Sequence, residues 1–229
     1  MKRELIIAID GPSGAGKSTL SKLLSRRLGY VNIDTGAMYR CVALASLRRG
    51  IDPQDGETLE ELCRGLDIDF VPEDGENRVL LDGEDVSEAI RTPEVSLLTS
   101  RVSAVPEVRS AMVNLQRKMG EKGGVVLEGR DIGTVVFPHA DVKFFLLASA
   151  RERGRRRYKE LKARGLDVDL DQTIAEVEAR DRADSERAHA PLIQAEDALT
   201  VDSTRMSIEE VLEYMLKEIR SRQASMGSA

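Results

Sequence analysis

A glycine-rich segment near the start of the chain has the residue types and the spacing of a phosphate-binding loop. It reads Gly11-Pro12-Ser13-Gly14-Ala15-Gly16-Lys17-Ser18-Thr19 and follows the apolar run 5–9. Glycines let the backbone curl around phosphates, and a helix beginning near Lys17 would point the positive end of its dipole at them. Lys17 suits the β- and γ-phosphates, and the Ser18 hydroxyl suits Mg²⁺. The segment therefore predicts a nucleoside triphosphate site with Mg²⁺ as cofactor.

Three further motifs are rich in charged residues. They are Asp34-Thr35-Gly36-Ala37-Met38-Tyr39-Arg40, then Glu128-Gly129-Arg130-Asp131-Ile132-Gly133-Thr134-Val135-Val136-Phe137-Pro138, and Arg180-Asp181-Arg182-Ala183-Asp184-Ser185-Glu186-Arg187. The first two follow predicted strands, and open α/β sheets bind ligands at the carboxyl ends of their strands. These motifs therefore indicate a second ligand site. From the residues alone, Asp34 is either a turn residue or an outer partner of the metal.

A different class of protein fits part of the pattern. A hydrolytic ATPase or a nucleotide switch needs an acidic residue at the end of an apolar strand, and Glu128 after the run 125–127 satisfies this requirement. The Asn-Lys-x-Asp motif that binds guanine in GTPase switches does not occur in the sequence. The ATPase or switch remains an alternative interpretation.

The elements that must hold these motifs alternate in type. Strand-length apolar runs lie at 5–9, 30–33, 125–127, 142–147 and 199–201, with helical segments between them. Helix signals are Gly29 and Gly50 at helix ends, Pro93 and Pro106 in first turns, and capping boxes at Ser149 with Glu152 and Ser207 with Glu210. We expect an α/β fold with a five-stranded parallel sheet flanked by helices. One helix should run from about Ala37 to Arg49.

Two segments depart from this alternation. The runs 67–71 and 78–82 predict an antiparallel hairpin inside a small β-rich insertion at about 65–90. A cluster of arginines, at Arg151, Arg153, Arg155, Arg156 and Arg157, falls within one and a half helical turns. Such a run ordinarily forms a solvent-exposed helix face. Alternatively, it forms a lid that closes over a phosphoryl group. We expect the chain to fray after Arg222.

Composition limits the class of protein. The 229 residues are 41% hydrophobic, enough for one domain with a small inserted lobe, and the net charge of −6 argues against nonspecific binding to nucleic acid or membranes. No apolar run is long enough to span a membrane, and Met1-Lys2-Arg3 leads directly into the first strand. Two cysteines predict reduced, buried thiols, and two histidines do not suggest a zinc site. We expect a cytoplasmic protein.

Together the motifs resemble the bacterial cytidylate kinase family, over essentially the whole chain and including the β-rich insertion. The resemblance implies a P-loop nucleoside monophosphate kinase fold forming a single kinase domain, 1–229. Its core would be about 1–64, 91–149 and 166–229, with the insertion of the monophosphate-binding lobe at about 65–90 and a mobile helical lid at about 150–165. It also implies the reaction of ATP with CMP or dCMP in pyrimidine nucleotide metabolism, by a protein we expect to be monomeric.

The resemblance further implies which residues bind the acceptor. Arg40, Arg130 and Arg180 would contact its phosphate or ribose, Asp184 and Arg187 its sugar and phosphate region, Ser100, Arg109 and Asp131 the cytosine, and Thr35 occupies a Ser or Thr position of the family. A carboxylate at Asp131 would accept from the cytosine amino group, whereas uracil presents an oxygen there. Uridylate should therefore be disfavoured. A helix cap for Asp131 and surface ion pairs for the arginines are the structural alternatives.

Catalysis requires neutralisation of charge on the phosphoryl oxygens more than covalent chemistry. We expect Lys17, Arg130 and an arginine of the lid, from Arg153, Arg156 and Arg157, to contact the transition state. No general base is needed, because the acceptor is an ionised phosphate oxygen. The remaining alternative within the same chemistry is a kinase for UMP or a small alcohol.

Overall fold

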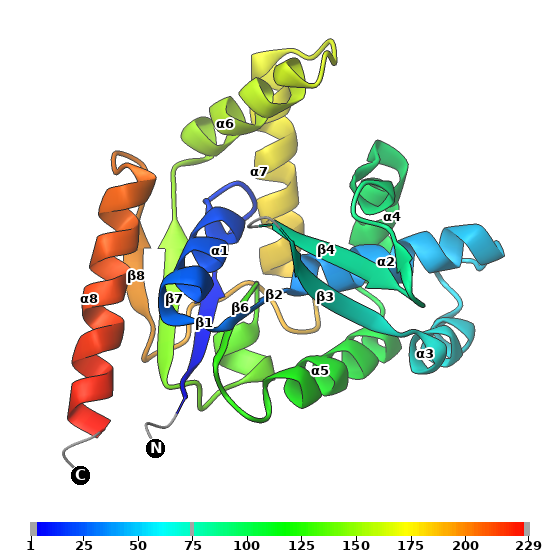
Figure 1. Ribbon diagram of the computed structural model, residues 1–229. Helices are drawn as coiled ribbons and strands as arrows, with labels where there is room; N and C mark the ends of the chain where they lie inside the picture. The colour runs from blue at the N-terminus through cyan, green and yellow to red at the C-terminus, as the bar shows by residue number, and fades with distance from the viewer. Residues whose placement is uncertain (1–3, 74–75, 227–229) are drawn as a thin grey trace. The chain divides into compact units, whose positions relative to one another are not determined.

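A computed structural model describes residues 4–73 and 76–226 of the chain (Figure 1). Its contacts divide the chain into two compact units. The first unit comprises the segments up to Tyr30 and from Gly124 onward, and the second runs from Val31 to Gly123. The phosphate-binding loop lies in the first unit.

Parallel strands form the centre of the first unit. They are β1 (Ile6–Asp10), β6 (Val125–Gly129), β7 (Val142–Leu147) and β8 (Leu199–Asp202). β1 pairs with β6 and with β7, and β7 pairs with β8, all in parallel. With β2 (Val31–Asp34) as the fifth strand, the order is β2-β6-β1-β7-β8. The five-stranded sheet predicted from the apolar runs is confirmed.

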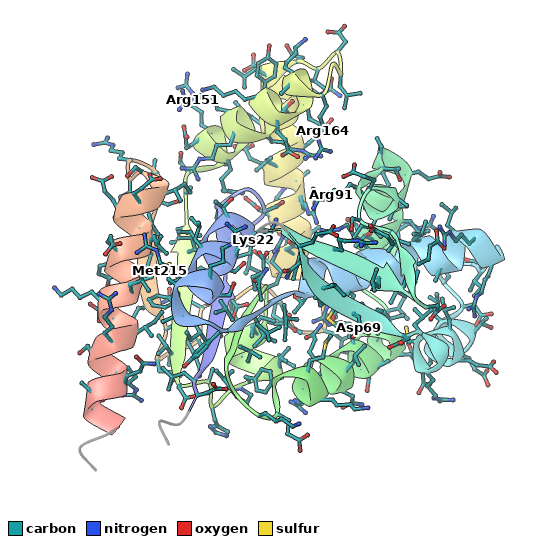
Figure 2. The ribbon with its side chains drawn as sticks, in the orientation of Figure 1. Lys22, Asp69, Arg91, Arg151, Arg164 and Met215 are labelled. Atoms are coloured by element: carbon teal, nitrogen blue, oxygen red, sulfur yellow. The ribbon has the colours of Figure 1, made fainter. Side chains whose placement is uncertain are left out.

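Alternate residues of the strands build the core of the first unit. Ile7 and Ile9 of β1 are fully buried and pack in one cluster with Phe144 of β7 and Met215 of α8 (Ile208–Met226); Met215 is labelled in Figure 2. The same cluster includes Leu20 of α1 (Lys17–Leu28), and α1 packs against α8. This apolar layer keeps the start of α1, and hence the phosphate-binding loop, at the carboxyl end of β1.

The helices of the first unit have some boundaries that the sequence indicates. They are α1 (Lys17–Leu28), the π-helical turn η2 (Ile132–Val136), α6 (Ala150–Ala163), α7 (Leu170–Glu186) and α8 (Ile208–Met226). Gly29 ends α1, and Ser149 and Ser207 cap the helices that follow them. The expectation that the chain frays after Arg222 is wrong, because α8 continues to Met226.

The second unit is mainly helical. Its helices are α2 (Thr35–Arg49), α3 (Gly56–Gly65), the 3₁₀ turn η1 (Ala89–Arg91), α4 (Pro93–Val102) and α5 (Pro106–Gly120). α2 begins two residues before the predicted Ala37, because Asp34 caps it by accepting from the Ala37 N–H at 2.8 Å. Cys41 and Cys63 are buried free thiols, as predicted.

The predicted antiparallel hairpin is confirmed in the second unit. β3 (Ile68–Glu73) pairs with β4 (Glu76–Leu81), and the short strand β5 (Glu84–Asp85) joins the outer edge of β4. Asp74 and Gly75, which the sequence places in the turn, lie outside the described residues. The bounds predicted for the core, insertion and lid stay predictions.

Candidate active site

The backbone of the phosphate-binding loop requires glycine at two positions. Gly11 has φ +147°, and a Cβ there would lie 2.1 Å from the carbonyl oxygen of Leu146. Gly16, which precedes α1, has φ +101°. Both conformations are costly for any residue with a side chain. The sequence pattern therefore records a real geometric constraint, and α1 starts at Lys17 as predicted.

Lys17 is a buried ammonium group. Only 5% of the residue is exposed, and its Nζ donates to the carbonyl oxygen of Pro12 at 2.8 Å. Burial, followed by the positive charge of Arg130, lowers the pKa of Lys17 to about 7, while Glu128 and Asp10 act in the opposite direction. Since a buried cation gains most from an anionic partner, this site favours a bound phosphate.

An oxygen suited to Mg²⁺ stands beside Lys17. Among residues 4–73 and 76–226, no group of three or more His, Cys, Asp or Glu side chains is arranged to hold a metal. Mg²⁺ that arrives with a nucleotide needs only one or two protein oxygens, because phosphates and water supply the others. The exposed Ser18 in the first turn of α1 fits that requirement.

The arginine cluster of α6 separates into two groups. Arg153 donates to the carbonyl oxygen of Ser13 at 3.0 Å, and Arg156 to that of Ala15 at 3.4 Å, so both contact the phosphate-binding loop. Arg155 pairs with Glu152, and Arg157 with Glu160 at 3.0 Å, on the exposed side of the helix. The solvated-face interpretation thus describes only part of the run.

The loop after β6 is held at both ends by charged side chains of neighbouring strands. Asp10, at the end of β1, accepts from the backbone N–H groups of Ile132 and Gly133 at 2.8 and 2.7 Å. Lys143, on β7, donates to the carbonyl oxygen of Pro138. Burial raises the pKa of Asp10 to about 6, although these N–H groups oppose the rise. The loop that carries the predicted acceptor residues is therefore fixed before any ligand binds.

Five of the predicted acceptor residues lie in the first unit, on this loop, on α7 and directly after α7. Arg130 donates to Asp184 at 2.7 Å, and Arg187 lies 3.9 Å from the buried Asp131. Burial tends to raise the pKa of Asp184, but the Arg130 charge and hydrogen bond hold it below its usual range. Asp131 makes no side-chain cap to η2, so the helix-cap alternative is wrong.

Arg180 adds positive charge near Lys17. It lies on α7 and is one of the cations that lower the pKa of Lys17. Glu128 is buried in β6 and acts on Lys17 with the opposite sign. The phosphate-binding loop and the loop after β6 thus share one electrostatic field.

Asp34 and Arg40 form a pair at the start of α2 in the second unit. Arg40 donates to Asp34 Oδ2 at 3.0 Å, while Asp34 Oδ1 caps the helix. A Cβ at Gly36 would lie 3.1 Å from Asp34 Oδ1 and 3.3 Å from Arg40. Asp34 is therefore a helix cap and an arginine partner, which agrees with the turn interpretation, while its role as an outer partner of the metal stays a prediction. Thr35, the first residue of α2, is buried.

Arg109, like Asp131, is a buried member of the predicted cytosine ligands. It is 5% exposed, its guanidinium lies 5.5 Å from the centre of the Tyr39 ring, and it donates to the carbonyl oxygen of Ser103 at 3.1 Å. The ring and the carbonyl fix the direction of this cation. Ser100 is exposed on α4.

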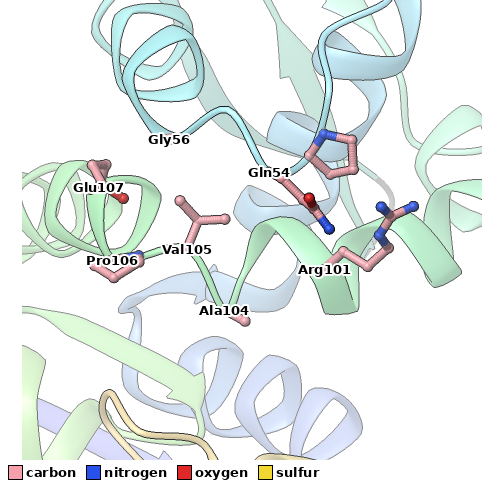
Figure 3. Close-up of a pocket in the computed structure, with 8 residues that line it drawn as sticks. Gln54, Gly56, Arg101, Ala104, Val105, Pro106 and Glu107 are labelled. Atoms are coloured by element: carbon pink, nitrogen blue, oxygen red, sulfur yellow. The ribbon is translucent and has the colours of Figure 1, made fainter.

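A separate cavity of about 510 Å³ opens elsewhere in the second unit (Figure 3). It lies between the start of α3 and the connection from α4 to α5, and its lining includes Gln54, Arg101 and Glu107. None of the acceptor residues predicted from the sequence lines it. The cavity is therefore no part of the predicted acceptor site.

Comparison with known proteins assigns the family. The family model described as cytidylate kinase matches residues 7–221. The chain belongs to the cytidylate kinase family. It is 70% identical over 223 residues to a cytidylate kinase from Syntrophotalea carbinolica, covering 97% of this chain and 95% of that one. It is 60% identical over 228 residues to the one from Geobacter sulfurreducens, covering 100% and 98%.

A solved structure of another kinase is also similar to this member of the cytidylate kinase family. The shikimate kinase from Acinetobacter baumannii, in complex with shikimate, has 15% identity and a TM-score of 0.47, with 96% of this chain and 95% of that chain covered.

Sequence reasoning missed several residues that shape the site of this cytidylate kinase family member. Asp10 ends an apolar strand with a charge, which is a signal that could have been followed. Ser203 gave no such signal, yet its buried hydroxyl lies 3.1 and 3.0 Å from the carbonyl oxygens of Ala15 and Leu147 and can donate to either one. Asp181 belongs to the motif 180–187, but no role was predicted for it; in the structure it pairs with Arg153.

Proposed function

We propose that this chain transfers the γ-phosphoryl group of ATP to CMP and dCMP, giving ADP with CDP or dCDP. The observation that carries the proposal is a glycine-constrained phosphate-binding loop with a buried Lys17, in a chain that matches the cytidylate kinase family over residues 7–221. The relatives named above support CMP as the acceptor, because they carry the name cytidylate kinase.

The arrangement around Lys17 suits phosphoryl transfer. In such reactions the protein mainly positions the reactants and neutralises charge on the transferred group. Lys17 and Arg130 supply positive charge within one electrostatic field, and Ser18 would hold Mg²⁺, which would supply further positive charge to the phosphates. We assign Lys17 and Arg130 to the transition state, together with one arginine of α6 from Arg153, Arg156 and Arg157.

On the acceptor side, a carboxylate is the group that discriminates. Asp131 is buried and would accept from the amino group of cytosine, while Arg187 lies close enough to hold its charge. Uracil would place an oxygen against the same carboxylate. The remaining acceptor residues that we propose are Thr35, Arg40, Ser100, Arg109, Arg130, Arg180 and Asp184.

Further parts of the proposal concern the closure of the segment 150–165, the oligomeric state and the cellular location. We propose that the segment 150–165 closes over the nucleotides, since α6 carries the two arginines that already contact the phosphate-binding loop. We also propose a monomer that works in the cytoplasm in pyrimidine nucleotide metabolism. No helix in the described part of the chain is long and apolar enough to cross a membrane.

The test is the rate of ADP formation from ATP and Mg²⁺ with CMP, dCMP, UMP, AMP, GMP or no acceptor. The proposal predicts rapid turnover with CMP and dCMP, slow turnover with UMP and almost none without acceptor. Equal rates with and without acceptor would instead support an ATPase, with Glu128 as the residue that positions water. Preference for UMP would refute the role of Asp131.

A further inference from the structure

The helices α6 and α7 pack closely at a defined position. A Cβ at Gly154 would lie 2.4 Å from Ile174 Cγ1 and 2.9 Å from its Cα, so glycine is what permits this approach. Thr173 and Val177 of α7 are buried on either side of the contact. Figure 2 labels Arg151 and Arg164, which mark the two ends of α6. The two helices therefore have a fixed register.

This register places Asp181 opposite Arg153. Asp181 follows Ile174 by seven residues, which is two helical turns, so both lie on the face of α7 that meets α6. Arg153 directly precedes the close contact at Gly154. Its NH1 and NH2 groups donate to Asp181 Oδ1 and Oδ2, forming a bidentate ion pair.

The guanidinium of Arg153 also reaches the phosphate-binding loop. NH1 donates to the carbonyl oxygen of Ser13 at 3.0 Å, and Nε donates to that of Ala148 at 2.8 Å. A Cβ at Gly14 would lie 3.3 Å from the Cβ of Arg153, so the backbone of the loop packs directly on this side chain. The loop, α6 and α7 thus meet at one buried cation.

A buried cation needs a partner of opposite charge. Arg153 is 4% exposed, and carbonyl oxygens alone do not compensate for the loss of water around a full charge. Asp181 supplies the carboxylate, and its two oxygens match the fork of the guanidinium. Without this carboxylate, Arg153 would gain free energy by turning toward solvent, and the Ser13 carbonyl would lose its donor.

We propose that Asp181 is a positioning residue for the phosphate donor. Its carboxylate holds Arg153 against the Ser13 carbonyl and so keeps the phosphate-binding loop in the shape that receives a triphosphate. Asp181 itself does not contact the nucleotide. The inference deepens the proposed function, on which it rests for the identity of the donor, ATP.

The primary experiment measures binding of a non-hydrolysable ATP analogue with Mg²⁺ by calorimetry, without acceptor, to the full chain and its Asp181→Asn variant. Asparagine has the same shape but turns an N–H group toward the guanidinium. We expect the affinity for the analogue to fall by about 10-fold to 100-fold, as for loss of a charged hydrogen bond. Asp171→Asn, an exposed site on the same helix, is the matched control and should bind within about 2-fold of the parent chain.

A double-mutant cycle tests whether Asp181 acts through Arg153. We expect Arg153→Met and the double variant Arg153→Met with Asp181→Asn to bind the analogue equally weakly, because residues that act as a unit are not additive. Additive losses, or analogue binding by Asp181→Asn equal to that of the parent chain, would overturn the proposal. If Asp181→Asn does not fold, Arg153→Lys replaces it, since lysine keeps the charge and loses the fork.

Kinetics separates a positioning role from general damage. For Asp181→Asn we expect KM for ATP to rise in step with the calorimetric loss, while KM for CMP changes by less than about 2-fold. Equal increases in both values would point to a global structural effect and refute the proposal. A parent chain that binds the ATP analogue but does not phosphorylate CMP would refute the proposed function alone.

Discussion

When a triphosphate binds, Lys17 should take up a proton from solvent. The pKa of Lys17 in the free protein sets how many protons are taken up at a given pH. With a pKa of about 7 in the free protein, Lys17 is about one-tenth protonated at pH 8 and about nine-tenths protonated at pH 6. Bound phosphates stabilise the charged form, so its pKa in the complex lies well above 8. Binding at pH 8 should therefore take up about 0.9 proton, and binding at pH 6 about 0.1 proton.

The affinity follows the same titration. Because only the protonated form binds phosphate well, affinity for a non-hydrolysable ATP analogue should fall about 5-fold between pH 7 and pH 8. Calorimetry in two buffers with different ionisation enthalpies measures the proton uptake directly, and Lys17→Met is the control that removes the group. A buffer-independent enthalpy at pH 8, or the same proton uptake in Lys17→Met, would refute the reasoning.

Four further predictions follow from particular residues. Asp131→Asn should reduce the preference for CMP over UMP in kcat/KM by about 10-fold or more, since an amide can donate to uracil; steady-state kinetics with both acceptors would contradict this by showing an unchanged ratio. Gly11→Ala should abolish ATP binding through its clash with a carbonyl oxygen, whereas Gly65→Ala, which meets no atom within 4 Å, should bind normally. Asp10 binds protons more tightly in the folded state, so wild-type stability should fall by about 2 kcal/mol relative to Asp10→Asn as pH rises from about 4 to 6; urea unfolding that shows a pH-independent difference would exclude it. Hydrogen exchange in residues 150–165 should slow when a bisubstrate analogue binds, and unchanged exchange there would count against a lid.

The features that were predictable from the sequence depend on neighbouring residues. The phosphate-binding loop is read from glycine spacing, and Gly29 ends α1 as expected, because both reflect backbone geometry within one turn. The strands could be predicted from apolar runs, because these runs too are local patterns. Local patterns thus specify the elements and the backbone of the phosphate-binding loop.

The features that were missed depend on contacts between distant residues. Asp131 does not cap the following turn, because the carboxylate of Asp10, 122 residues away from Ile132, already accepts from its N–H group. Likewise, the arginine run could not be divided until α7 supplied Asp181 as a partner for Arg153. Which arginine faces a partner depends on the packing of α6, and that packing is not encoded in the run itself.

The product balance of the reaction distinguishes phosphoryl transfer to CMP from hydrolysis of ATP. Chromatography of a mixture of the chain with ATP, Mg²⁺ and CMP would quantify CDP, ADP and inorganic phosphate over time. We expect CDP and ADP in equal amounts and no phosphate above the enzyme-free control. ADP formed together with an equal amount of inorganic phosphate, without CDP, would contradict this expectation.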